Sequence, residues 1–172
     1  MAVEIERKFL VDVARWDPGA SIGVRYRQGY LSSSPECTVR VRVAGEHGVL
    51  GVKGPTEGIT RLEFEYPIPV EDAEAMLRLL VGQSVIEKVR YRVPVGPRTW
   101  EVDVFEAANA GLVLAEVELP SADAVVEPPE WVGREVSGDP RYYNAYLARH
   151  PFTSWPPARP GGRAHGSGSP GA

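Results

Sequence analysis

Apolar and charged residues alternate with a period of two along most of this chain, and no other feature constrains the fold as strongly. In the first segment Val3 and Ile5 fall on one face of an extended strand, while Glu4, Glu6 and Lys8 fall on the other. Because successive side chains of a β-strand point to opposite faces, this alternation predicts strands with one apolar and one charged face. The fold class that we expect is therefore mainly β (α+β).

The same alternation recurs along the chain. It is found in residues 3–11, 39–43, 61–68, 88–93, 100–104 and 113–119, and further strands are expected around residues 25–32 and 48–54. Short turn-like segments join these stretches, which favours antiparallel pairing between neighbours. About eight strands are predicted in this way.

Two segments have apolar residues at helical spacing instead. Residues 70–81 end before Gly82, and residues 140–149 end before Pro151, which are common positions for a helix to stop. We therefore expect a few helices that flank the strands.

The end of the chain differs in composition from the rest. From Thr153 onward it consists largely of Pro, Gly, Ser and Arg, with almost nothing to bury. A chain of 172 residues fits a single folded unit. We predict one domain over residues 1–152 and a disordered Pro/Gly-rich tail over residues 153–172.

The composition of the charged strand faces indicates that they point inward. A face in contact with water normally mixes Thr, Ser, Gln and Lys, whereas these faces hold like-charged pairs such as Arg40 with Arg42 and Glu116 with Glu118. Two such charges lie only about 7 Å apart on a strand, so their repulsion is costly without a counter-charge or a ligand. The alternatives are a face that simply meets water and charges that only pair with one another.

Eight such strands could close into an antiparallel β-barrel whose lumen has room for one small ligand. The lumen would then be a charged tunnel, and the two helices and the loops would cover the apolar outer faces. The basic residues on the charged faces are Lys8, Arg40, Arg42, Lys53, Arg61, Lys88, Arg90 and Arg92, and the acidic ones are Glu4, Glu6, Glu63, Glu65, Glu101, Asp103, Glu116 and Glu118.

The chemistry of these two sets predicts a metal–polyphosphate site. Carboxylates clustered without His or Cys suit hard cations such as Mg²⁺ or Mn²⁺. Clustered Arg and Lys side chains suit phosphate oxygens.

Composition also narrows the partners and the location. The formal net charge of −4 provides no global positive field for nucleic acid or acidic lipid. Cys37 is the only cysteine, the N-terminal stretch is charged where a signal peptide is apolar, and no run reaches the length of a membrane span. We expect a cytoplasmic protein with no nucleic-acid or membrane partner.

The order of these motifs resembles the CYTH domain, or triphosphate tunnel metalloenzyme, family. Its Glu-x-Glu-x-Lys signature corresponds to residues 4–8. The resemblance continues through residues 27–31, 40–42, 53–54, 61–65, 88–91, 100–103 and 115–119, and it covers roughly residues 1–152. It implies an eight-stranded antiparallel tunnel that binds a triphosphate with a divalent metal ion.

The resemblance also implies roles for individual residues. The metal ligands would be Glu4, Glu6, Glu116 and Glu118, with Asp103 as an additional one, and Glu63 and Glu65 would be acidic lining. The phosphate-binding set would be Lys8, Arg40, Arg42, Lys53, Lys88 and Arg90, and Arg61 joins it because it shares the charged face.

The catalytic residues would be Glu4, Glu6 and Lys8. Whether Lys8 is a general base or only binds phosphate stays open, because nearby cations would lower its pKa and the two glutamates would raise it.

The predicted function is hydrolysis of inorganic tripolyphosphate, or a related triphosphate, with Mg²⁺ or Mn²⁺ as cofactor. The alternatives within the same tunnel are a class IV-type adenylate cyclase and a thiamine triphosphatase. An alternative of another class is a non-catalytic module that binds polyphosphate or a nucleotide. The protein would be a monomer or a homodimer with a small-molecule triphosphate as its partner.

Overall fold

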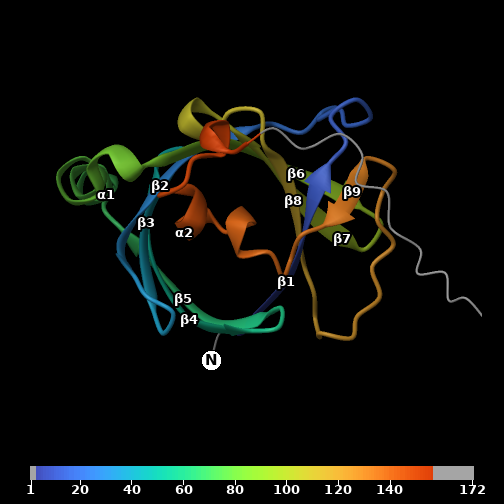
Figure 1. The fold of residues 1–172 in the computed structure, drawn as a ribbon, viewed down its shortest axis with the longest axis horizontal. Coiled ribbons are helices and arrows are strands. Elements are labelled where there is room, and N and C mark those ends of the chain that lie inside the picture. The colour runs from blue at the N-terminus through green and yellow to red at the C-terminus, as the bar shows by residue number, and fades with distance from the viewer. Residues whose placement is uncertain (1–2, 157–172) are drawn as a thin grey trace, which may run out of the picture.

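Eight antiparallel strands close into a barrel in the computed structural model, which describes residues 3–156 (Figure 1). The strands are β1 (Val3–Val11), β2 (Val24–Ser33), β3 (Thr38–Ala44), β4 (His47–Glu57), β5 (Thr60–Ile68), β6 (Ile86–Val95), β7 (Arg98–Phe105) and β8 (Val113–Glu118). They pair in the order β5-β4-β3-β2-β6-β7-β8-β1, and β1 returns to β5. The predicted eight-stranded barrel is confirmed.

Strand β1 closes the ring because its two halves pair with different neighbours. Residues 3–5 pair with β5, and residues 6–10 pair with β8. The end of β1 also pairs with a short ninth strand, β9 (Val132–Glu135). Strand β1 therefore closes the barrel between β5 and β8, and its charged face lies at this junction.

The predicted helix over residues 70–81 is confirmed, and it covers the outer face of β3 and β4. It consists of α1 (Val70–Met76) and a wider turn over Leu77–Val81. Ala73 and Leu77 are buried against Val41 and Val43. In the part of the chain that the structure describes, no helix is long and apolar enough to cross a membrane.

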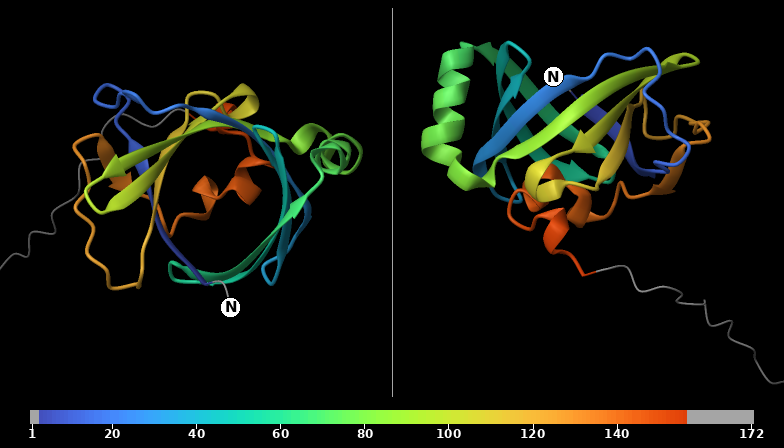
Figure 2. Two further views of the ribbon diagram at one scale, coloured as in Figure 1. Left: turned by 180° about the vertical axis from the view of Figure 1, so that it is seen from behind. Right: turned by 90° about the horizontal axis from the view of Figure 1, so that it is seen from above.

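The expectation that two helices and loops cover the apolar outer faces is met only in part. On β7, Trp100 is buried between Phe9 and Trp131, with ring centroids 5.5 and 5.7 Å away. The outer face of β5 is not covered in this way, since Phe64 and Tyr66 are 39% and 55% exposed. The second predicted helix does not reach an outer face, because it lies at one end of the barrel (Figure 2).

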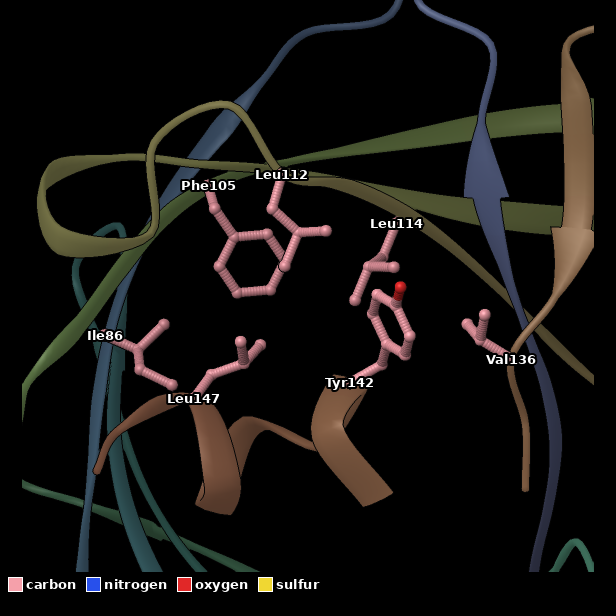
Figure 3. Close-up of a cluster of buried hydrophobic side chains, with 7 residues drawn as sticks. All are labelled: Ile86, Phe105, Leu112, Leu114, Val136, Tyr142 and Leu147. Carbon is pink, nitrogen blue, oxygen red and sulfur yellow. The ribbon is translucent and has the colours of Figure 1, made fainter. Parts of the chain in front are cut away.

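The prediction of a continuous helix over residues 140–149 is wrong. Pro140–Tyr142 form one turn, Tyr143 is extended with φ −76° and ψ 136°, and α2 (Asn144–Leu147) follows. The interruption lets Tyr142 and Leu147 pack into one apolar cluster (Figure 3). The other buried members of this cluster are Ile86, Phe105, Leu112, Leu114 and Val136. We call residues 140–147 the plug, because they lie across this end of the barrel (Figure 1).

The folded body continues past the predicted domain end at residue 152. Phe152–Ser154 form a further turn, and Trp155 packs edge-on against Tyr142 with ring centroids 5.4 Å apart. Residues 153–156 thus belong to the structure around the plug, because two aromatic side chains anchor them. The rest of the predicted tail lies outside the described residues.

Ala107, in the turn between β7 and β8, has a φ of 50°, which favours glycine. We predict that Ala107→Gly raises the free energy of unfolding by about 0.5–1 kcal/mol, because it removes the Cβ strain. Urea unfolding would measure this gain, and the dependence of the unfolding free energy on urea concentration should stay the same as in the wild type. Ala110→Gly is the matched control, since Ala110 lies in the same turn at φ −55°. An equal gain in both variants would contradict the explanation.

Candidate active site

The charged faces of the strands meet inside the barrel, where they line a cavity of about 760 Å³. The predicted residues in its wall are Glu4, Glu6, Lys8, Arg40, Arg42, Lys53, Arg61, Glu63, Glu65, Arg90, Arg92, Glu101, Glu116 and Glu118. These faces therefore point inward, as predicted, and both signs of charge converge on one space.

Two of the predicted residues, Lys88 and Asp103, do not line the cavity. They are 1% and 0% exposed, and they lie behind Arg90. Asp103 accepts hydrogen bonds from Lys88 Nζ at 2.5 Å and from Arg90 Nε and Nη2 at 2.6 Å each. Although burial alone raises it, Arg90 and Lys88 lower the pKa of Asp103 below its usual value. In this arrangement Asp103 holds Arg90 in place and has no face toward a ligand.

The pairing of β1 with β8 brings three of the predicted metal ligands together. Glu6 lies opposite Glu118 in the register, and Lys8 lies opposite Glu116. Glu4 follows on the same face of β1, where its Oε2 is 2.7 Å from Lys53 Nζ. The carboxylates therefore share one side of the lumen.

Lys8 is surrounded by two of these carboxylates. Its Nζ lies 2.8 Å from Glu116 Oε1 and 3.8 Å from Glu6 Oε1. Burial lowers the pKa of Lys8, but the charges of Glu116 and Glu6 outweigh burial and raise it above the usual lysine value. Lys8 therefore keeps its proton, which favours phosphate binding over the general-base role.

Lys88 has the opposite electrostatic setting. Burial, with Arg90 nearby, lowers its pKa to about 8 despite the charge of Asp103. Of these two lysines, Lys88 is the one that can lose its proton near neutral pH. Arg90 stands between it and the cavity.

On the opposite side of the lumen, arginines bridge a second acidic pair. Arg40 Nη2 contacts Glu65 Oε1 at 2.8 Å and Glu63 Oε1 at 3.2 Å, and Arg42 Nη2 contacts Glu65 Oε1 at 3.0 Å. Buried charges that are paired in this way cost much less than isolated ones. These four inward charges are thus paired with one another in this structure.

Two further basic residues are held differently. Arg61 donates from Nη2 to Thr38 Oγ1 and to the backbone oxygen of Gly54, at 3.2 and 3.0 Å. The side chain of Arg92 is 72% exposed and lies 3.5 Å from Glu101. Arg61 therefore faces the cavity with hydrogen bonds that leave its charge available to an anion.

The donor set fits a hard divalent cation, although basic side chains now occupy it. Within residues 3–156, no three His, Cys, Asp or Glu side chains are arranged to hold a metal ion. Burial, with the charge of Glu116 nearby, raises the pKa of Glu6 to about 6. Both burial and a nearby carboxylate disfavour the charge of Glu6, and a cation bound by oxygen ligands would offset both.

Several cavity residues escaped the sequence analysis because they are not on a charged face. On β2 the charged Arg25 and Arg27 point outward to Glu87 and Glu74. Their uncharged neighbours Tyr26 and Tyr30 point into the cavity instead. The plug contributes Tyr143, Asn144 and Ala145. The sequence signal available for β2 was the alternation of its side chains. If its charged residues are taken as the inward ones, however, the wrong face of β2 is assigned to the lumen.

A closed barrel whose lumen carries both carboxylates and basic side chains defines the class of this protein, a charge-lined tunnel barrel. The model of the CYTH domain family matches residues 2–143. The chain therefore belongs to the CYTH domain family.

The chain is similar to two bacterial proteins that are named inorganic triphosphatase. The protein from Acetivibrio thermocellus is 48% identical over 155 residues, which cover 90% of this chain and 99% of the relative. The protein from Nitrosomonas europaea is 39% identical over 150 residues, which cover 84% and 96%. A crystal structure of an inorganic triphosphatase matches with a TM-score of 0.63 and 36% identity, over 86% of this chain and 95% of that one.

The raised pKa of Glu6 gives a prediction about stability without metal. A carboxyl group whose pKa is higher in the folded state destabilises the fold once it ionises. We predict that Glu6→Gln raises the free energy of unfolding at pH 8 in EDTA by about 1–2 kcal/mol. The gain should shrink as the pH falls through 6 toward 4.5, where Glu6 itself is protonated in the folded protein.

Thermal or urea unfolding across this pH range would measure the difference. Glu46→Gln, in the exposed turn before β4, is the control and should change little. A gain for Glu6→Gln that does not vary with pH would contradict the electrostatic origin.

Proposed function

We propose that this protein is a metal-dependent triphosphatase that hydrolyses inorganic tripolyphosphate inside the barrel. The observation that carries the proposal is the single cavity in which four carboxylates on β1 and β8 face a set of arginines and lysines. Two relatives at 48% and 39% identity, named inorganic triphosphatase, support the reaction.

Glu4, Glu6, Glu116 and Glu118 would hold the Mg²⁺ or Mn²⁺ ion, because all four face the cavity from adjacent strands. When bound, such an ion neutralises negative charge on phosphate oxygens as it develops. The carboxylates would orient the ion, and in this structure Glu6 and Glu116 also contact Lys8.

The basic residues would hold the triphosphate by exchanging partners. In this structure Arg40, Arg42 and Lys53 contact carboxylates. Phosphate oxygens accept the same charge-assisted hydrogen bonds, so a bound triphosphate can replace those carboxylates. The same basic side chains would thus pair with carboxylates in the ligand-free protein and with phosphate oxygens in the ligand-bound protein.

Positioning accounts for most of the catalysis in this scheme. Arg90 is fixed from behind by Asp103 and from the side by Glu116, so its guanidinium is preorganised. Lys8 stays protonated and can neutralise a phosphate oxygen. The plug and its apolar cluster lie at one end of the cavity, where they would limit the entry of bulk water.

Organic triphosphates remain the alternative substrates. Thiamine triphosphate or ATP would need a surface for the organic group, and the cavity wall is dominated by charged side chains. A non-catalytic binding module would need the basic residues only, so the four inward carboxylates count against it.

Phosphate release from tripolyphosphate, thiamine triphosphate and ATP, measured with Mg²⁺ or Mn²⁺ and with EDTA, tests the proposal. We expect tripolyphosphate to be hydrolysed fastest and EDTA to stop the reaction. Cyclic AMP as the main product from ATP would contradict the assignment, and so would tight tripolyphosphate binding with no phosphate released under any of these conditions.

Glu4→Gln should lower turnover of tripolyphosphate by roughly 100-fold or more, since it removes a proposed metal ligand and with it several kcal/mol of transition-state stabilisation. Its unfolding midpoint should stay near that of the wild type. Glu46→Gln again serves as the control and should retain full turnover. If Glu4→Gln turns over like the wild type, Glu4 is not a metal ligand.

A further inference from the structure

Tyr26 occupies a special position on β2, between two arginines of the proposed phosphate-binding set. In the register it lies opposite Ala44 on β3 and opposite Lys88 on β6. Its diagonal neighbours on the inward face are therefore Arg42 on one side and Arg90 on the other. Diagonal neighbours across strands are within reach of aromatic and long side chains.

Both arginines contact the aromatic ring. The Cζ atoms of Arg42 and Arg90 each lie 5.3 Å from the centroid of the Tyr26 ring. At this distance the negative face of the ring attracts a guanidinium group, by about 0.5–2 kcal/mol depending on burial. Since β2 runs between β3 and β6, the ring lies between the strands that carry the two cations.

The two arginines differ in how firmly other residues hold them. Arg90 is bonded to three carboxylates, Asp103, Glu101 and Glu116. Arg42 contacts a single carboxylate, that of Glu65, and its Nε is buried without a hydrogen-bond partner among the described residues.

The surroundings also disfavour the charge of Arg42. Burial, with Arg40 and Arg90 nearby, lowers the pKa of Arg42 below its usual value. The position of Arg42 therefore depends on the Tyr26 ring more than that of Arg90 does.

We propose that Tyr26 is a positioning residue, whose ring sets the spacing of Arg42 and Arg90 so that both guanidinium groups can bind the same triphosphate. The proposal rests on the proposed function and adds a determinant of substrate affinity to it. The ring itself touches no reacting atom in this scheme. It offsets the repulsion between two cations and holds the long Arg42 side chain between the ring and Glu65.

The test compares Tyr26→Leu with Tyr26→Phe in the full chain. Tyr26→Leu removes the aromatic face and should raise the KM for tripolyphosphate roughly tenfold, which corresponds to the loss of about 1.4 kcal/mol of binding. The kcat should change much less, because Arg90, which three carboxylates hold, stays in place. Tyr26→Phe keeps the ring and should restore the wild-type KM.

Tyr66→Leu is the matched control, because Tyr66 is 55% exposed on the outer face of β5. It should leave KM and kcat unchanged. A double-mutant cycle with Arg42→Ala separates positioning from an independent role, because Tyr26→Leu should then have little further effect on KM.

Tripolyphosphate binding measured by calorimetry on the same variants distinguishes the two proposals. Wild-type protein that neither binds nor hydrolyses tripolyphosphate overturns the proposed function. Wild-type hydrolysis with an unchanged KM and Kd in folded Tyr26→Leu overturns the role of Tyr26 alone. An effect of Tyr26→Leu on ATP but not on tripolyphosphate would also overturn it, because the ring would then stack on a base.

Discussion

Burying a charge is costly unless an opposite charge lies beside it, and the lumen of this barrel buries many charges at once. Lys88 and Asp103, both almost fully buried, contact each other, and Arg90 joins them to Glu101 and Glu116. The inward faces can coexist only because acidic and basic strands are neighbours. Strand order and register are therefore constrained by electrostatics as well as by the apolar outer faces.

The same constraint links folding to function. In this structure the cations of the lumen lie between its carboxylates and pair with many of them. Under the proposed function, a divalent cation and a triphosphate would offer both sets a partner of opposite charge at the same time. Glu6 departs from this balance, because burial and the nearby charge of Glu116 raise its pKa. A binding site is most easily recognised where the protein leaves its own charges poorly satisfied.

Alternation in the sequence predicted the barrel and the inward faces of most strands, because strand periodicity is a local property. How deeply a side chain is buried in the lumen is not a local property of its strand. Asp103 and Lys88 share the charged faces of their strands, yet Arg90 covers both of them. On β2 the sequence did not reveal which side chains point inward, because Arg27 pairs outward with Glu74 while Tyr26 points inward. These contacts depend on which strands become neighbours in the barrel. The sequence of a single segment does not contain that information.

The plug has a consequence for the traffic of molecules through the barrel. Tyr142 and Leu147 pack into the apolar cluster, and the plug that carries them lies across one end of the barrel (Figure 2). Under the proposed function, a linear triphosphate would therefore enter, and its products would leave, mainly by the opposite end. Orthophosphate that stays in the lumen would then compete with the next substrate molecule, which is product inhibition.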